Sequence, residues 1–265
     1  MRTALFCCLA SAAILGAAHA EDAEPVAKGG QTYARHLAEA ARKDRPEVLA
    51  VAIATESKGA PPAPVGSDPM GGASGAVART PLVNVSGDRL GEIDITYAKA
   101  GDHAAASAAI QRFIARRVLS AKNLADPYPY DQVHSLATYA QRLVDQTLAA
   151  HPELLVFAIH ATGPGEKTNV IIGSNIGRIG KAADEDDLRV IQQGSTNLEV
   201  AEGGKRFEVE LPLNDARGAR IGALGVVFAF KAGDDKDALH RRAIAIRDAL
   251  ARKISTSAAL FKPQA

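Results

Sequence analysis

Residues 33–54 read YARHLAEAARKDRPEVLAVAIA, and residues 139–160 read YAQRLVDQTLAAHPELLVFAIH. The two stretches align without a gap and share Tyr, Ala, Leu, Pro, Glu, Leu, Ala and Ile at corresponding positions. A second match follows in the same order, because PLVNVSGDRLGEIDITYA (81–98) aligns with PLNDARGARIGALGVVFA (212–229). Each of these blocks is followed within one residue by Lys-Ala-Gly-Asp. Two matches in one order indicate an internal duplication, so we expect two related units.

Each repeat opens with an amphipathic helix and a buried strand. In the second copy, Leu136, Ala140, Leu143 and Thr147 recur at helical spacing before His151-Pro152 ends the run. The strands expected next, 154–161 and 48–54, are rich in Val, Ile, Leu and Ala, which is typical of strands buried on both faces.

The second matching block predicts a hairpin followed by a closing helix. Residues 206–213 and 221–230 would form the strands, with a polar turn at 214–218. Asp102 and Asp234 stand where the N-cap of the closing helix is needed. In the second copy that helix would place one apolar row on the core: Leu239, Ala243, Ile246, Leu250 and Ile254.

The two copies differ in the middle. The second carries a long segment, 162–205, whereas residues 58–75 of the first are dominated by Gly, Pro, Ser and Ala and predict a loop. We therefore expect a reduced unit at 31–120, a linker at 121–132, a complete unit at 133–256 that holds any working pocket, and a tail at 257–265.

The first twenty residues have the pattern of a cleaved signal peptide. Arg2 precedes a run of apolar or small residues, Ala18-His19-Ala20 suits a signal peptidase, and an acidic stretch follows at once before a linker at 21–30. The run is short for a membrane anchor, which needs about 20 apolar residues. These residues predict an exported protein, periplasmic or secreted.

Composition then excludes several function classes. Cys7 and Cys8 are the only cysteines and lie in the leader, so the mature chain has no thiol or disulfide chemistry. Loss of Arg2 lowers Lys+Arg from 31 to 30, equal to the 30 Asp+Glu. A formally neutral chain lacks the basic excess typical of nucleic-acid binding, so we expect no nucleic-acid partner.

The order of elements resembles a PAS-like extracellular sensor domain. The stretch NVIIGSNIGRIGK (169–181), with the acidic run 184–187 after it, is similar to the Cache (PDC) domains of bacterial chemoreceptors and sensor kinases. The likeness covers 133–256 well and 31–120 loosely. It implies an α+β fold of two tandem units, each an antiparallel sheet flanked by N- and C-terminal helices.

The resemblance also implies a small-molecule pocket between the central sheet and the segment that crosses it. Carboxylate-binding relatives often carry Arg and His on the strand before the I-G-K turn, where this chain has Val170 to Gly173. The aromatic and Arg pattern of amino-acid binders is also missing. Family members usually continue into a membrane helix and an output domain, whereas this sequence ends at Ala265.

Five residues are the candidate ligand-binding groups. Ser174 and Asn175 offer short hydrogen-bonding side chains, while Arg178 and Lys181 offer positive charge for an anionic ligand. The alternative for Arg178 and Lys181 is that both are solvated surface residues around a Gly-rich turn. His160 ends a core strand, where it could reach a ligand or act as an edge histidine with a water partner.

Other readings of these motifs are disfavoured. The run 173–181 lacks the Gly pattern and the final Ser or Thr of a phosphate loop. Acidic residues 184–187 fit the first turn of a helix better than a metal site, because they complement the helix dipole. No nucleophile elbow or metalloprotease motif occurs, so we expect no catalytic residues, no metal and no cofactor.

The sequence thus predicts an exported binding protein that captures a small molecule in its second unit and reports it to a separate membrane sensor or transporter. The alternative is a cell-envelope interaction module with a decayed pocket, whose helices at 31–45 and 235–256 serve in dimerisation or docking. A closed polar cavity would favour binding, and an exposed apolar helix face would favour interaction. An enzyme would require a perturbed acid or base beside His160.

Overall fold

The computed structural model describes residues 31–57, 60–67, 75–130 and 137–264. The predicted leader with Cys7 and Cys8, the linker 21–30 and Leu136 lie outside these ranges. Across the described ranges, every helix is too short or too polar to cross a bilayer.

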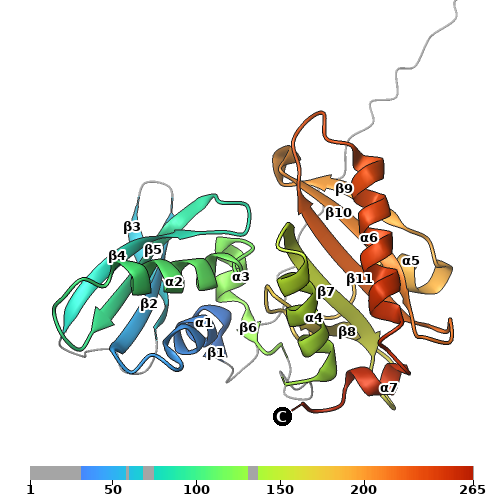
Figure 1. Cartoon of the computed structure of the whole chain (residues 1–265), viewed down its shortest axis with the longest axis horizontal. Helices are drawn as coiled ribbons and strands as arrows, with labels where there is room; N and C mark the ends of the chain where they lie inside the picture. Colours follow the sequence, from blue (N-terminus) through green and yellow to red (C-terminus); the bar gives the residue numbers. More distant parts are fainter. Residues whose placement is uncertain (1–30, 58–59, 68–74, 131–136, 265) are drawn as a thin grey trace, which may run out of the picture.

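The first part of the chain forms a four-stranded antiparallel sheet with its helices (Figure 1). Its strands run in the order β3-β2-β5-β4, and a separate two-stranded ribbon joins β1 to β6. The elements in chain order are β1 (Gln31–Thr32), α1 (Tyr33–Arg42), β2 (Val48–Ser57), β3 (Ala60–Ser67), β4 (Ala76–Val83), β5 (Arg89–Tyr97), α2 (Ala104–Ala115), α3 (Ala121–Ala125) and β6 (Pro127–Tyr128).

The second part forms a five-stranded antiparallel sheet in the order β8-β7-β11-β10-β9. Its elements in chain order are α4 (Tyr139–Ala150), β7 (Leu154–Thr162), β8 (Asn169–Ser174), α5 (Glu185–Gln193), β9 (Asn197–Ala201), a 3₁₀ turn η1 (Glu202–Gly204), β10 (Arg206–Asn214), β11 (Arg220–Ala229), α6 (Lys236–Ala251) and α7 (Ser257–Leu260). The expected mixed α+β class with antiparallel sheets is confirmed.

The two sheets share a strand order. In each, the first strand after the opening helix lies between the second strand and the last one, and β9 is the additional strand of the second sheet. Both opening helices begin with the same cap, because the hydroxyls of Thr32 and Thr138 accept hydrogen bonds from the backbone N–H of Arg35 and Gln141. That the units arose by duplication stays a prediction.

Alternation along the strands gives the second sheet one wholly apolar face. Its core cluster is contributed by alternate residues of β7, β10 and β11, by Val170 and Ile172 of β8, and by one face of α4 and α6. Burying each such side chain contributes about 1.5–3 kcal/mol, so this face dominates the stability of the unit. The strand residues are Phe157 and Ile159 of β7, Phe207, Val209 and Leu211 of β10, and Leu224, Val226 and Phe228 of β11.

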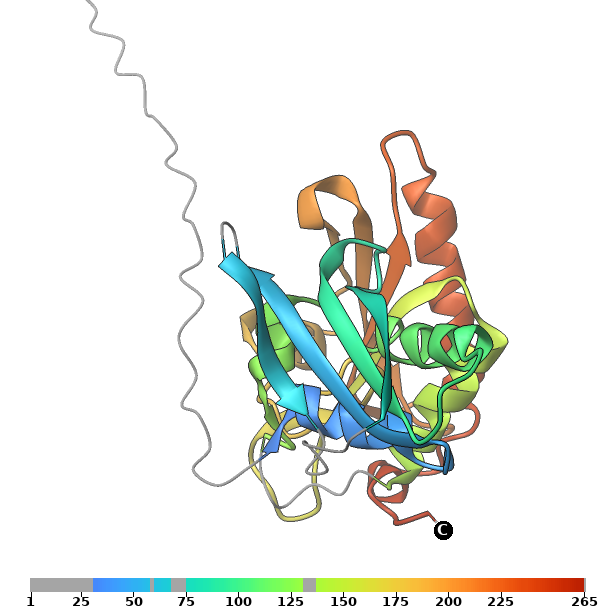
Figure 2. The same ribbon diagram turned by 90° about the vertical axis from the view of Figure 1, so that its left-hand side faces the viewer.

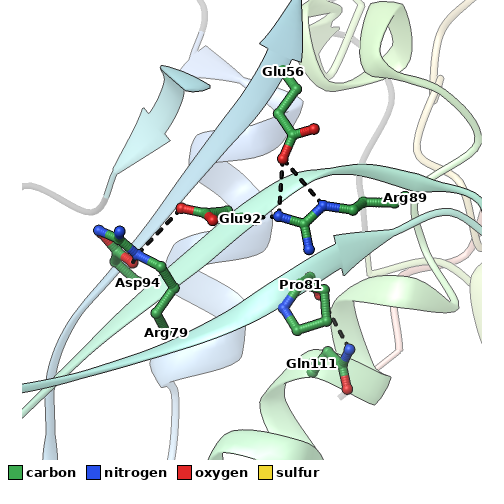
Figure 3. A network of polar contacts seen from close by, with 7 residues as sticks. All are labelled: Glu56, Arg79, Pro81, Arg89, Glu92, Asp94 and Gln111. Atoms are coloured by element: carbon green, nitrogen blue, oxygen red, sulfur yellow. Dashed lines mark hydrogen bonds and ion pairs between the residues drawn. The ribbon is translucent and has the colours of Figure 1, made fainter. Parts of the chain in front are cut away.

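The outer face of the first sheet is solvated and carries ion pairs (Figure 3). Arg79 of β4 bonds Asp94 of β5 through both Nε and Nη2, at 2.7 and 2.9 Å. Arg89 bonds Glu56 of β2 at 2.9 Å and approaches Glu92 at 3.3 Å. Exposed pairs of this kind stabilise little, so the network mainly keeps an uncovered sheet face soluble.

Several local expectations need correction. Residues 60–67 form the strand β3 rather than a loop; its prolines are tolerated because β3 is an edge strand and needs donors on one side only. Helix α6 is capped by Asp235, and Asp234 instead accepts a bond from the backbone N–H of Lys231. Asp102 likewise precedes the N-cap of α2 by one residue.

Two segments expected to be connecting or terminal chain are ordered. The linker 121–132 contains α3 and β6, and Leu124 is fully buried. The tail forms α7, because Leu260 inserts into the second core and the backbone N–H of Gln264 bonds the carbonyl of Ala137.

Two glycines of β11 provide a test of this sheet. A Cβ at Gly222 would lie 1.8 Å from the carbonyl oxygen of His160, whereas one at Gly225 would meet only the Cβ of Ala158 at 3.9 Å. We expect Gly222→Ala to lower the free energy of unfolding by about 1–3 kcal/mol. Gly225→Ala should leave it unchanged or raise it by up to about 1 kcal/mol. Urea titrations of both variants measure this, and equal losses would contradict the strand register.

Candidate functional site

A cavity of about 160 Å³ lies on the face of the second sheet opposite α4 and α6. The segment between β8 and α5, residues 175–184, crosses this face of the sheet and is called the crossing segment below. Small residues on the strands, Ala158 and Gly225, leave the space between the sheet and this segment. The apolar part of the lining is Leu119, Val156, Ile171, Ile176 and Val227, and the polar part is His160, Arg178, Lys181, Asp184, Asp187, Arg206, Glu208 and Glu210.

Helix α5 brings the first acidic groups to this cavity. Asp184 caps α5 by accepting from the backbone N–H of Asp187, and the Asp187 side chain accepts from the N–H of Asp184, which completes a capping box. The expected helix start is therefore confirmed. Asp187 is buried, and burial raises its pKa to about 7, with the Asp184 carboxylate adding to the rise.

Strand β10 supplies the facing carboxylates. Glu208 and Glu210 alternate with the core residues Phe207, Val209 and Leu211, so they point to the cavity. Burial raises the pKa of Glu210 to about 8, helped by the negative charges of Asp187 and Glu208. The pKa of Glu208 is also raised, chiefly by burial.

His160 stands on β7 beside these acids. It is 7 % exposed, and its Nδ1 lies 3.4 Å from Oδ2 of Asp187 without a hydrogen bond of good geometry. Burial lowers the pKa of His160 to about 4, so the imidazole is neutral near pH 7. The perturbed acid that catalytic use of this cavity would require is thus present at Asp187.

Two of the cations at the cavity are engaged by the first part of the chain. Arg206, buried on β10, donates to Oγ of Ser86 at 2.8 Å and to the carbonyl of Leu119 at 3.1 Å. Arg178 approaches Asp126 at 3.8 Å. Lys181 is half-buried.

Ser174 and Asn175 lie away from this cavity. They belong to the region where the end of α2 meets β7 and β8, which we call the joint between the two sheets. The Asn175 side chain accepts from the N–H of Phe157 at 3.0 Å and donates to the carbonyls of Leu155 and Arg116, both at 2.9 Å. The Ser174 hydroxyl accepts from the N–H of Ile176. The hydrogen bonds of these two side chains go to the backbone and support the structure. The five predicted residues therefore do not form one site.

The same joint contains a more open groove of about 480 Å³. Tyr33 lies in its wall, where its hydroxyl donates to the carbonyls of Arg117 and Asn175 and its ring packs over Gly177. The groove passes between α1, the end of α2 and α4, with Ser174 and Asn175 in its lining.

Three residues of this cavity were not predicted from the sequence: Asp187, Glu208 and Glu210. A signal was available on β10, because Arg206, Glu208 and Glu210 alternate with Phe207, Val209 and Leu211. A strand with one apolar face and charges on the other usually faces water; only the crossing segment buries these charges here.

Comparisons with known proteins leave the family open. No family model matches the chain, and no curated protein matches it. Solved structures with some likeness include a GAF sensor protein from Burkholderia vietnamiensis (14% identity, 45% of this chain and 76% of that one, TM-score 0.34). Others are the inducer-binding domain of the transcription factor PobR from Acinetobacter with 3-hydroxybenzoic acid (12%, 43% and 94%, 0.30) and a type II free methionine-R-sulfoxide reductase from Thermoplasma acidophilum (12%, 44% and 97%, 0.30). At these TM-scores, function must be argued from the site itself.

The buried acids predict how stability varies with pH. Asp187 and Glu210, with pKa values of about 7 and 8, keep protons in the folded state that the unfolded chain has already lost above pH 5. Stability should therefore fall as pH rises from 6.5 to 8.5; His160, whose pKa is lowered, opposes this trend only below 6.5. Glu210→Gln should flatten the decline measured by thermal melting, and an unchanged slope would contradict the assignment.

The joint predicts a structural role for Asn175. Asn175→Ala leaves one backbone donor and two carbonyls without partners, so the free energy of unfolding should fall by about 1–3 kcal/mol. Gln146→Ala, on the exposed face of α4, is the control and should change it by less than about 0.5 kcal/mol. Equal effects in urea unfolding would refute the role.

Proposed function

We propose that the chain is an exported sensor module that binds a small molecule in the cavity of its second unit and reports binding to a separate membrane partner. One observation carries the binding step, namely the cavity between the second sheet and α5 whose lining includes the buried ionisable residues His160, Asp187 and Arg206. Burying ionisable groups is costly, so a fold without use for them would place apolar residues there. Export rests on the signal-peptide pattern of residues 1–20.

The first unit would carry the signal rather than bind the ligand. Its corresponding sheet face is uncovered and holds the ion pairs of Arg79 and Arg89. It nevertheless contributes a wall of the cavity through Leu119, which belongs to the apolar contact of Val156, Ile176 and Val227. Because Arg206 of β10 bonds the carbonyl of Leu119, a ligand that shifts β10 would move the first unit. Figure 2 views the chain from the side of the first unit, with the strands of its sheet toward the viewer.

The interaction-module alternative finds less support. The apolar residues of α1 and α6 pack against the sheets, and large hydrophobic residues exposed in the described ranges lie elsewhere, at Val77, Leu188, Leu198 and Val200. Dimerisation through these helices stays a prediction.

Catalysis is a second candidate, favoured by the contact of His160 with Asp187. A neutral imidazole beside a carboxyl group whose pKa is about 7 could exchange protons with a bound substrate. The test is turnover: a ligand that the protein converts, and that His160→Gln still binds but no longer converts, would establish an enzyme.

Thermal-shift measurements against carboxylates, amino acids, purines, polyamines and common metals test the proposed function. A ligand that binds only the folded state should raise the melting temperature with concentration. Gly225→Val, which fills open space in the cavity, should abolish the shift.

Ala149→Leu is the matched control, because it adds bulk in the groove between the sheets instead. A shift lost in Ala149→Leu and kept in Gly225→Val would move the site to that groove. Absence of any shift across the panel would reject the binding function.

A further inference from the structure

The carboxylates of the cavity outnumber the positive charges that could neutralise them. Glu208 and Glu210 project from β10 toward Asp187 and Asp184 of the α5 start. In the described part of the chain, ion pairs of the neighbouring arginines go to other acids, Arg206 to Glu202 at 3.6 Å and Arg178 to Asp126 at 3.8 Å. Arg178 and Arg206 act on Glu208 only at longer range, where they lower its pKa without reversing the rise that burial causes, and Lys181 is the third cation of the lining. The four carboxyl groups therefore face three cations.

His160 provides an independent indication that this wall faces a ligand. Its side chain is more than nine-tenths buried, lines the cavity, and has an Nδ1 without a hydrogen-bond partner. A buried ring nitrogen left unbonded is costly, and a ligand N–H would satisfy a neutral imidazole that accepts there.

The lining beside the acids is apolar. Val227 of β11 is the cross-strand neighbour of Glu208 and clusters with Ile176 and Leu119. Together with Ala158, these side chains offer hydrocarbon contacts and no donors. The volume of about 160 Å³ is well below the roughly 300–1,000 Å³ of pockets for drug-sized ligands. Among the described residues, His, Cys, Asp and Glu do not cluster closely enough to hold a metal ion.

We propose that this cavity takes a compact organic cation, with an ammonium or amidinium head against Glu208, Glu210 and Asp187 and a short apolar body toward Val227 and Leu119. The inference rests on the proposed binding function. A charged N–H donor bonded to carboxylates makes the stronger, charge-assisted kind of hydrogen bond. The apolar body of the ligand displaces water from the apolar lining around Val227 and Leu119.

Binding of such a cation is coupled to proton release. The carboxyl groups of Asp187 and Glu210, with pKa values of about 7 and 8, are partly protonated without ligand at neutral pH, and a cation favours their ionised forms. Affinity should therefore rise between pH 6.5 and 8.5. The titratable and charged groups facing this site are His160 of β7, Arg178 and Lys181 of the crossing segment, Asp184 and Asp187 of the α5 start, Glu199 of β9, and Arg206, Glu208 and Glu210 of β10.

The test is calorimetry with three probes of one size: n-butylammonium, n-butanol and n-butyrate. We expect the cation to bind at least tenfold more tightly than the neutral or anionic probe, and at least tenfold more weakly to Glu208→Gln/Glu210→Gln. Glu185→Gln, an exposed change in the first turn of α5, should leave its affinity unchanged. Binding heats should depend on the ionisation enthalpy of the buffer, which reports released protons.

Four outcomes overturn the inference. These are equal or tighter binding of n-butyrate or n-butanol, cation binding that survives in the double variant, stabilisation by Zn²⁺ or Ca²⁺ without any by n-butylammonium, and no binding of n-butylammonium. If a compound of the wider panel still binds and Gly225→Val removes it, the proposed function stands and only the ligand class is wrong. If none binds, both fail.

Discussion

Side-chain alternation along β7, β10 and β11 is the constraint on which the second unit depends. Every second residue must fill the space under α4 and α6, which assigns Phe157, Phe207 and Leu224 to the core. The residues between them are free of that demand and face the crossing segment. Because Ala158 and Gly225 are small there, side chains do not fill the space between the sheet and the crossing segment, and a cavity remains. The same geometry that stabilises the unit thus positions its candidate site.

The joint between the sheets makes the cavity a property of the whole chain. Asn175 ties β7 to the end of α2, and Asn123 of α3 donates to the carbonyl of Ile176 at 3.0 Å. Leu119 then forms part of the cavity wall, with Arg206 bonded to its carbonyl. These bonds connect side chains of one part of the chain to backbone groups of the other, so the cavity wall depends on both parts.

Charge distribution separates the two sheets more sharply than their strand order does. On the first sheet, Arg79 and Arg89 meet acids in water, where the cost of keeping these charges is small. On the second, Glu208 and Glu210 are half-buried among other acids, and their raised pKa values express the cost of this placement. The proposed cationic ligand would lower that cost by favouring the ionised forms of these acids.

The sequence by itself determined those elements whose signals are local. The repeat at Tyr33 and Tyr139, the hairpin of 206–230 and the acidic start of α5 are local signals, because helical spacing, alternation and capping involve residues a few positions apart. It did not predict the strand β3, because prolines are typical of loops. It also did not reveal that the Asn175 side chain would bond backbone groups between the two sheets. From the sequence alone, Glu208 and Glu210 are expected to face solvent. In the folded chain they face the start of α5. Burial by a segment distant in the chain, and the partners it brings, exist only in the tertiary structure, and burial is what turns ordinary charged residues into a candidate site.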